Sequence, residues 1–256
     1  MFLNSIESDA IELLRANEPP EGYTLAYSGG KDSVVIRAVA ARAGVRHECH
    51  YHPTTLDPPE LVRFVRATPG VFIDQPRWSL LSLVKHEGIL PTRFVRYCCR
   101  ALKERMARGS VIVGVRSAES PRRARDWMPV QNTHRCTTIC PILHWSDDDV
   151  WSYIRTNSLP YCDLYSEGFK RLGCIGCPLI SRRKRESEFA RWPRFERIWR
   201  RACAICHSAG RYQMNDLNTE ESLWEWWMDG QPSNRTNESC GGSGYLFELE
   251  NDEADL

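Results

Sequence analysis

A glycine-rich hexapeptide, Ser28-Gly29-Gly30-Lys31-Asp32-Ser33, contains residue types that can bind a phosphate group. Two glycines let the backbone approach a ligand closely, and the N–H groups at a helix start attract an anion. Lys31 adds a positive charge that suits phosphate, and Ser33 is a residue type that caps helices. Residues 23–27 before it predict a short strand, and residues 34–43 after it predict a helix. We therefore predict a nucleotide phosphate site in this turn.

The hexapeptide differs from the Walker A motif, GxxxxGK[ST]. That motif would require a glycine at position 25 and a hydroxyl residue after the lysine, where this chain has Leu25 and Asp32. The loop resembles that of the PP-loop ATP pyrophosphatases, which split ATP between the α and β phosphates and leave AMP on a substrate. The alternative is an ordinary Gly-Gly turn with a capping serine and no ligand.

Four cysteines form two pairs whose spacing suits a metal site. Cys98 and Cys99 are adjacent at the head of a predicted helix, and Cys174 and Cys177 form a CxxC. Four thiolates from two segments can hold zinc or an iron–sulfur cluster, and adjacent cysteines favour two corners of a bulky [4Fe–4S] cube. A zinc site, or buried packing of the adjacent pair, stays open as an alternative.

Other cysteines have weaker signals. Cys203, Cys206 and His207 spell CAICH, the spacing of c-type haem attachment, but they lie in an arginine-rich helical stretch with no export signal. Cys136 and Cys140 could join Cys203 and Cys206 in a second metal site. Buried thiols without a metal are the commoner outcome.

Length and composition limit the kind of protein. The chain has 256 residues, 42% of them hydrophobic, which suffices for one large domain or one domain with an appendage. It has no apolar run of about 18 residues, and its amino-terminal stretch predicts an amphipathic helix rather than a signal peptide. Eleven cysteines without an export signal indicate a reducing compartment. We expect a cytoplasmic protein without a membrane segment.

A net charge of +1 hides two oppositely charged stretches. Residues 181–211 contain ten lysines and arginines against three acidic residues, whereas residues 216–256 contain eleven acidic residues against one arginine. The basic stretch is a candidate contact for DNA or RNA. Alternatively, its arginines cover the solvated face of a helix and pair with the acidic stretch. The arginines in question are Arg191, Arg194, Arg197 and Arg201.

Strand and helix patterns alternate through the first half of the chain. We expect strands at 23–27, 45–51, 71–74 and 110–115, and helices at 34–43, 58–67, 80–86 and 97–108. This alternation predicts a doubly wound, mostly parallel α/β sheet with helices on both faces. Ligands bind beyond the carboxyl ends of such strands, where the turns at 28–33 and 116–125 lie. Residues 1–180 should form this domain, including the cysteine site, and residues 181–256 a helical extension.

Six segments, in one order between about Tyr23 and Pro178, resemble those of a known family. Besides the hexapeptide they are TTLDPPELVRFV, which ends at Val65, YCCRALKE (Tyr97–Glu104), GVRSAESPRR (Gly114–Arg123), PILHWSDDDVWSYI (Pro141–Ile154) and LPYCDLYSEGFKRLGCIGCP (Leu159–Pro178). The family is that of phosphoadenosine phosphosulfate reductase, within the PP-loop superfamily. The resemblance implies a Rossmann-like fold of the HUP type.

The resemblance also implies site residues. Cys98, Cys99, Cys174 and Cys177 match the cysteines that hold a [4Fe–4S] cluster in the members that have one. The GxRxxES segment lies near the nucleotide in the family, and Arg122 and Arg123 can make bidentate phosphate contacts. The implied nucleotide-binding residues are Ser28, Gly29, Gly30, Lys31, Asp32, Ser33, Arg116, Glu119, Ser120, Arg122 and Arg123, with Lys31 and Asp32 as catalytic candidates.

The family contains enzymes with two kinds of reaction. The glycine-rich loop and the carboxyl-terminal stretch indicate which of the two this chain resembles. Sulfonucleotide reductases bind preformed adenylyl sulfate, have usually lost the SGGxDS loop, and attack sulfur with a cysteine in a carboxyl-terminal ECG[IL]H motif. Here the loop is intact, Asp32 can help to hold Mg²⁺ on ATP, and the tail around Cys240 reads ESCGG with no histidine. This combination favours ATP as the nucleotide.

An intact loop with such cysteines resembles the sulfur-insertion proteins of DNA phosphorothioation systems. The resemblance implies that ATP adenylates a nucleic-acid oxygen and that a sulfur donor, such as a cysteine desulfurase, then displaces AMP. One alternative is a sulfonucleotide reductase that uses Cys240 and a thioredoxin-like partner. The other is a non-enzymatic module that binds nucleotide or nucleic acid.

Overall fold

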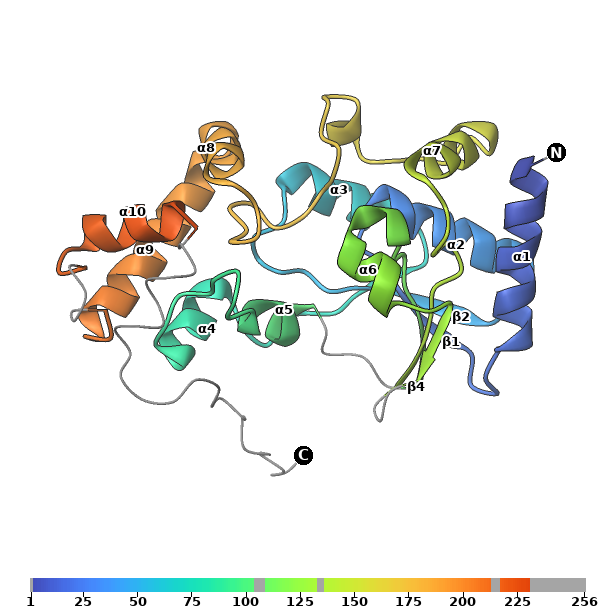
Figure 1. Ribbon diagram of the computed structural model, residues 1–256, viewed down its shortest axis with the longest axis horizontal. Coiled ribbons are helices and arrows are strands. Elements are labelled where there is room, and N and C mark those ends of the chain that lie inside the picture. Colours follow the sequence, from blue (N-terminus) through green and yellow to red (C-terminus); the bar gives the residue numbers. More distant parts are fainter. Residues whose placement is uncertain (1, 104–108, 133–135, 213–216, 231–256) are drawn as a thin grey trace. The chain divides into compact units, whose positions relative to one another are not determined.

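The structure is a computed structural model of the chain, and it describes residues 2–103, 109–132, 136–212 and 217–230. The chain divides into two compact units, Met1–Leu83 with Tyr97–Ile175, and Val84–Arg96 with Gly176–Leu256. The first unit contains the sheet and the second is helical (Figure 1). Cys240 lies outside the described residues.

Six strands form one sheet in the order β3-β2-β1-β4-β6-β5. They are β1 Tyr23–Ala26, β2 His47–Tyr51, β3 Val71–Ile73, β4 Gly109–Ile112, β5 Val130–Asn132 and β6 Cys136–Ile139. All neighbours are parallel except β5, which runs antiparallel to β6, so the prediction of a mostly parallel sheet is confirmed. The chain winds outward from β1 to β2 and later returns to β4 on its other side. A switch point therefore lies between β1 and β4.

The strand β1 and the helix after it form because their apolar residues face the core. Leu25 of β1 is fully buried, as are Val35, Ile36 and Val39 on α2 (Lys31–Ala43). The helix begins three residues earlier than predicted, because Gly30 is extended and acts as its N-cap. The predicted capping role of Ser33 is wrong: Ser33 lies inside the first turn, where its hydroxyl donates to the Gly30 carbonyl at 2.8 Å.

Further helices surround the sheet in the first unit. They are α1 Phe2–Ala16, α3 Pro59–Ala67, α5 Tyr97–Leu102, α6 Pro121–Asp126 and α7 Asp147–Thr156, with 3-10 turns at Ser117–Glu119 and Asp163–Tyr165. Both α1 and α7 pack against α2 (Figure 1). The helix predicted at 97–108 ends at Leu102, and residues 104–108 lie outside the described part. One more helix, α4 (Leu80–Glu87), crosses the boundary between the units.

The second unit is built around tryptophans. Its helices are α8 Arg182–Arg191, α9 Pro193–Ser208 and α10 Glu220–Met228. Trp199 stacks on Trp227 with ring centroids 4.4 Å apart, and both side chains are almost fully buried. Arg185 is buried too, donates to the Trp227 carbonyl at 2.7 Å and lies over the Trp227 ring. These tryptophans therefore pack the core of the second unit.

The basic stretch pairs only in part with acidic residues. Arg182 forms ion pairs with Glu225 and Asp229, and Arg200 pairs with Glu221, all on or next to α10. By contrast, the exposed Arg194, Arg197 and Arg201 of α9 have no ion pair with any described residue. Their spacing of three and four residues places them along one face of the helix.

Two further observations concern the disulfides and the membrane segments of the described residues. The ten cysteines in the described residues form no disulfide. No described helix has both the length and the apolar content needed to cross a bilayer.

Candidate nucleotide site

The glycine-rich loop follows β1 directly and packs against α3. Gly29 has a φ of +73°, and a Cβ there would lie 2.6 Å from Val65 and 2.7 Å from Leu61. Glycine adopts this conformation without strain, and its lack of a Cβ permits this close approach. The N–H groups of Asp32 and Ser33, in the first turn of α2, have no partner among the described residues. The loop thus presents free backbone donors at the end of a central strand.

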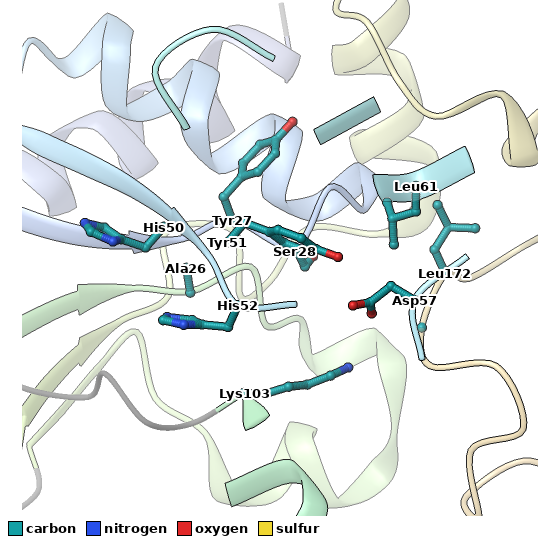
Figure 2. Close-up of a pocket in the computed structure, with 11 residues that line it drawn as sticks. Ala26, Tyr27, Ser28, His50, Tyr51, His52, Asp57, Leu61, Lys103 and Leu172 are labelled. Atoms are coloured by element: carbon teal, nitrogen blue, oxygen red, sulfur yellow. The ribbon is translucent and has the colours of Figure 1, made fainter. Parts of the chain in front are cut away.

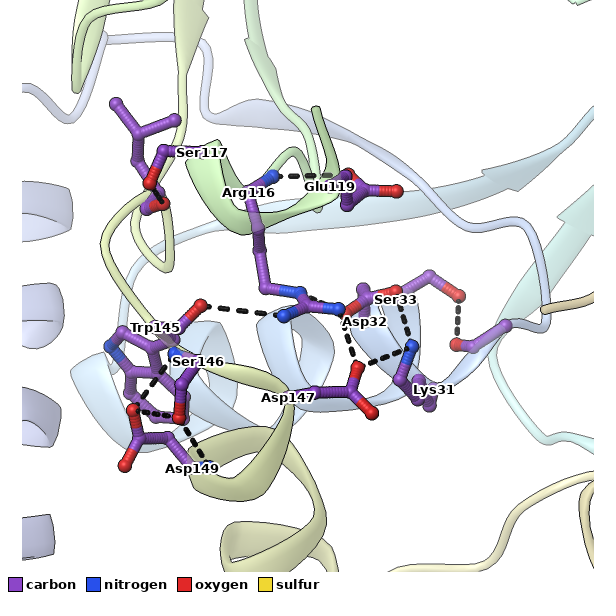
Figure 3. A network of polar contacts seen from close by, with 12 residues as sticks. Lys31, Asp32, Ser33, Arg116, Ser117, Glu119, Trp145, Ser146, Asp147 and Asp149 are labelled. Atoms are coloured by element: carbon purple, nitrogen blue, oxygen red, sulfur yellow. Dashed lines mark hydrogen bonds and ion pairs between the residues drawn. The ribbon is translucent and has the colours of Figure 1, made fainter. Parts of the chain in front are cut away.

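A network of four charges lies at the start of α2 (Figure 3). Lys31 Nζ is 3.1 Å from an Asp147 carboxylate oxygen and 3.5 Å from Asp32. Arg116 contacts the same two carboxylates, with Nε 2.6 Å from Asp32 and a terminal nitrogen 2.8 Å from Asp147. Both cations are buried, at 5% and 3% exposure. Two cations therefore share two carboxylates at the switch point.

The position of Asp147 explains how it joins this network. It is the first residue of α7, whose N-terminus is fixed by a capping box between Ser146 and Asp149. Asp147, Asp148 and Asp149 all lie in the first turn of α7, where negative charge favours the helix N-terminus. Burial opposes ionisation of Asp147, but Lys31 and Arg116 outweigh it, and its pKa lies below the usual value. Asp147 is therefore an ionised member of the site, a role that the sequence reasoning missed.

The turn after β4 delivers only one of its predicted nucleotide residues to the loop. Arg116 reaches Asp32, whereas Glu119 accepts the Arg116 N–H and pairs with Arg123. The Ser120 side chain caps α6. The Arg122 side chain is 84% exposed and lies 3.4 Å from Asp126. Glu119, Ser120, Arg122 and Arg123 have partners within their own turn, so Arg116 is the residue of this segment that contacts the loop.

A cavity of about 150 Å³ opens beside the loop (Figure 2). Its walls come from the ends of β1 and β2, the segment after β2, and the chain before Cys174. They include Ser28, His50, Tyr51, His52, Asp57, Leu61, Lys103 and Leu172. The buried Asp57 accepts the Thr54 N–H at 2.6 Å, and the Lys103 ammonium points toward its carboxylate. The cavity thus combines an apolar wall with one carboxylate, one ammonium group and two imidazole rings.

Lys103 links this cavity to two of the predicted cluster cysteines. Cys174 raises the Lys103 pKa most, and Asp57 and Cys99 act in the same direction. Burial raises the pKa of the Cys174 thiol, which Lys103 opposes. The Cys174 sulfur is also 3.4 Å from the Thr54 hydroxyl. The first unit therefore brings Cys99 and Cys174 into the field of one ammonium group.

The cysteines fit a cluster in their chemistry. Three of the four lie in the first unit, whereas Cys177 belongs to the second. Within the described residues, no three His, Cys, Asp or Glu side chains converge closely enough to hold a metal ion. The same holds for the second metal site considered for Cys136, Cys140, Cys203 and Cys206. Burial raises the pKa of Cys203 and Cys206 to about 12, as expected of packed thiols.

Four residues of the site and its cavity were not predicted from the sequence. Asp57 and Lys103 lie within segments already singled out, TTLDPPE and YCCRALKE, so their motifs offered a signal. Asp147 looked like an ordinary helix-start acid. Tyr165, which accepts the Lys31 N–H at 3.0 Å, has no local signal because its partner is 134 residues away.

A glycine-rich loop at the switch point of a mostly parallel sheet, with free helix-start donors and two buried cations, defines an α/β protein of the nucleotide-binding kind. The family model described as phosphoadenosine phosphosulfate reductase domain matches residues 22–180. The chain belongs to this family.

Individual relatives agree with this assignment. The chain is 30% identical over 223 residues to an uncharacterized protein of Methanocaldococcus jannaschii, which covers 79% of the chain and 45% of the relative. It is 29% identical over 146 residues to adenosine 5′-phosphosulfate reductase of Oceanobacillus iheyensis, covering 54% and 61%. The chain thus spans about half of the length of these curated relatives. Phosphoadenylyl-sulfate reductase from Candida auris has a similar fold, with a TM-score of 0.50 and 18% identity over 68% of this chain and 95% of that one.

Proposed function

We propose that the protein binds ATP with Mg²⁺, cleaves it to AMP and pyrophosphate, and supports sulfur transfer to a nucleic acid in the cytoplasm. The observation that carries this proposal is the intact loop at the β1–β4 switch point, with Lys31 and Arg116 buried beside it. Family membership supports a sulfonucleotide or related nucleotide chemistry. The loop favours ATP over a preformed sulfonucleotide.

Three loop residues, and Arg116 beside them, have a task in this reaction. The N–H groups of Asp32 and Ser33 bind phosphate oxygens, and Lys31 offsets the charge that builds on the leaving pyrophosphate. Asp32 would help to hold a magnesium ion, and Arg116 fixes the direction of the Asp32 carboxylate. Bound Mg²⁺ would supply charge neutralisation on the phosphates. The acceptor oxygen takes AMP as pyrophosphate leaves, and sulfide-level sulfur from the donor then displaces AMP.

The acceptor and the sulfur carrier rest on two further features. The exposed face of α9 with Arg194, Arg197 and Arg201 suits a phosphate backbone, because these cations are not neutralised by described residues. Cys98, Cys99, Cys174 and Cys177 would hold a [4Fe–4S] cluster, and Lys103 supports this by supplying positive charge near two of the thiols. Such a cluster would hold sulfur or brace the site. A cysteine desulfurase with a reductant is the expected sulfur source.

Replacing Asp32 by asparagine is expected to lower pyrophosphate release from ATP about a hundredfold or more, because the variant loses the carboxylate that contacts Arg116 and would help to hold Mg²⁺. The assay measures AMP and pyrophosphate without oxygen, with Mg²⁺, DNA or RNA, and a sulfur donor. Asp126→Asn serves as the matched control, because it removes an exposed carboxylate whose ion pairs with described residues all lie within α6. Equal rates in wild type and Asp32→Asn, or no pyrophosphate from wild type under any condition, would refute the proposal.

Protein purified without oxygen is expected to be brown and to contain about four irons per chain. Cys174→Ser should lose colour and iron because one thiolate ligand is missing. Cys203→Ala, which removes a buried thiol of α9, should retain both. Iron and sulfide counts with the visible spectrum provide the measurement. A colourless wild type, or equal iron in Cys174→Ser, contradicts the cluster.

Relatives named adenosine 5′-phosphosulfate reductase favour one alternative, a sulfonucleotide reductase with Cys240 as nucleophile and a thioredoxin-like reductant. The same assay separates the two when radiolabelled adenylyl sulfate replaces ATP. Label trapped on wild type but not on Cys240→Ser identifies the reductase. Pyrophosphate from ATP without such trapping identifies the proposed enzyme.

A further inference from the structure

One backbone N–H group of the loop donates a hydrogen bond to a side chain that is distant in the sequence. The Lys31 N–H, in the first turn of α2, donates to the Tyr165 hydroxyl with the two atoms 3.0 Å apart. Donors in this turn lack partners within the helix and are the groups that bind phosphate oxygens. The phenol oxygen therefore occupies a place that suits a phosphate oxygen.

Aromatic neighbours hold Tyr165 at this place. Its ring lies edge-on to Trp151 of α7, with centroids 5.2 Å apart and planes at 83°, and 6.4 Å from the Tyr161 ring. Trp151 lies one turn after Asp147, the carboxylate that pairs with Lys31 Nζ. The same helix thus supplies the charge network and the support for the hydroxyl.

The Tyr165 hydroxyl keeps its proton. Burial raises the pKa of the phenol, and this outweighs the opposing effect of the Lys31 N–H, while Asp32 and Asp147 raise the pKa further. A protonated phenol both accepts and donates hydrogen bonds. No described residue accepts a bond from it. Its donor capacity is therefore available to a ligand.

We propose that Tyr165 binds the phosphate chain of the nucleotide, accepting from Lys31 in the nucleotide-free chain and donating to a phosphate oxygen in the loaded chain. The inference rests on the proposed function, in which the loop holds a triphosphate. Because the Lys31 nitrogen and the Tyr165 oxygen are 3.0 Å apart, one oxygen about 2.8 Å from each can accept from both. Two charge-assisted bonds then replace one neutral bond, and the Lys31 N–H stays paired.

A hydroxyl that only blocked the loop would have the opposite effect. Phosphate would then have to displace Tyr165, and removing the hydroxyl would strengthen binding. A donor that contacts phosphate weakens binding when it is removed. The sign of the change in affinity therefore separates the two roles.

The test measures binding of inorganic pyrophosphate by calorimetry to wild type, Tyr165→Phe and Tyr161→Phe. Tyr165→Phe retains the ring and its packing on Trp151, and we expect its affinity to fall about tenfold. Tyr161→Phe is the matched control, because it belongs to the same aromatic group and its hydroxyl bonds no described residue. Its affinity should stay within about twofold of wild type. Pyrophosphate should also raise the melting temperature of Tyr165→Phe less than that of the other two.

The other results contradict either the inference or the proposed function on which it rests. Unchanged or tighter pyrophosphate binding by Tyr165→Phe excludes donation to phosphate, and a variant that does not fold gives the hydroxyl a structural role. Wild type that binds pyrophosphate but releases none from ATP refutes the proposed function alone and leaves the tyrosine comparison valid. Wild type that binds no pyrophosphate overturns both.

Discussion

Replacing Arg116 by lysine is expected to reduce pyrophosphate release from ATP about a hundredfold or more while the chain stays folded. Three nitrogens of Arg116 point to three acceptors: Asp32 at 2.6 Å, Asp147 at 2.8 Å and the Trp145 carbonyl at 3.4 Å. A lysine ammonium is a point charge without this planar arrangement and cannot bridge the two carboxylates in the same way. Asp32 would then lose the partner that fixes its direction.

The control for this prediction is Arg122→Lys, in the same turn. The Arg122 side chain is 84% exposed and, among the described residues, pairs with Asp126 alone, so the rate should remain within about twofold of wild type. Unfolding curves of both variants establish that the chains are folded. An Arg116→Lys enzyme with nearly the wild-type rate would show that bridging of the carboxylates is not needed.

Gly176→Ala should destabilise the second unit by about 3 kcal/mol, the largest stability effect that we expect. Gly176 lies inside the CxxC with a φ of +72°, and an added Cβ would be 2.5 Å from Trp199 and 2.6 Å from Phe189. Both neighbours are buried and cannot move away easily. The substitution therefore combines an unfavourable backbone conformation with overpacking.

Tryptophan fluorescence during denaturant unfolding measures this loss, because Trp199 and its stacked partner belong to the same unit. Gly173→Ala, three residues earlier, is the matched control: a Cβ there meets nothing within 4 Å. Its unfolding should shift by less than about 0.5 kcal/mol. Equal midpoints for the two variants would contradict the packing argument.

Much of the fold was predictable, because the spacing of apolar residues along the sequence indicates which side chains are buried. The apolar alternation of 23–27 and the helical pattern after it mark β1 and α2 correctly, apart from the helix start. The start was misplaced because the prediction treated the whole hexapeptide as a turn, whereas Gly30 alone supplies the extended residue before the helix. Strands β5 and β6 were missed, since VQN and CTTI are short and show little apolar alternation.

Residues of the candidate site were predictable only where they belong to a recognisable sequence motif. The glycines, Lys31 and Arg116 stand in segments with a recognisable pattern, and the structure brings Arg116 to the loop. Asp147 and Tyr165 were not identifiable, because their importance arises from contacts that tertiary packing creates. An acidic residue in the first turn of a helix and a tyrosine of a short turn look the same in sequence whether or not they reach a distant helix.

The long sequence separations around the loop also determine when the site can form. The hexapeptide leaves the ribosome early, but the partner of Asp32 follows 84 residues later and the partner of the Lys31 N–H 134 residues later. Contacts between such distant residues form late, because a long loop must close before any of them stabilises the chain. The site should therefore become competent near the end of folding of the first unit, after the central strands have paired. A nascent chain that stops before residue 165 would carry the complete hexapeptide without its finished surroundings.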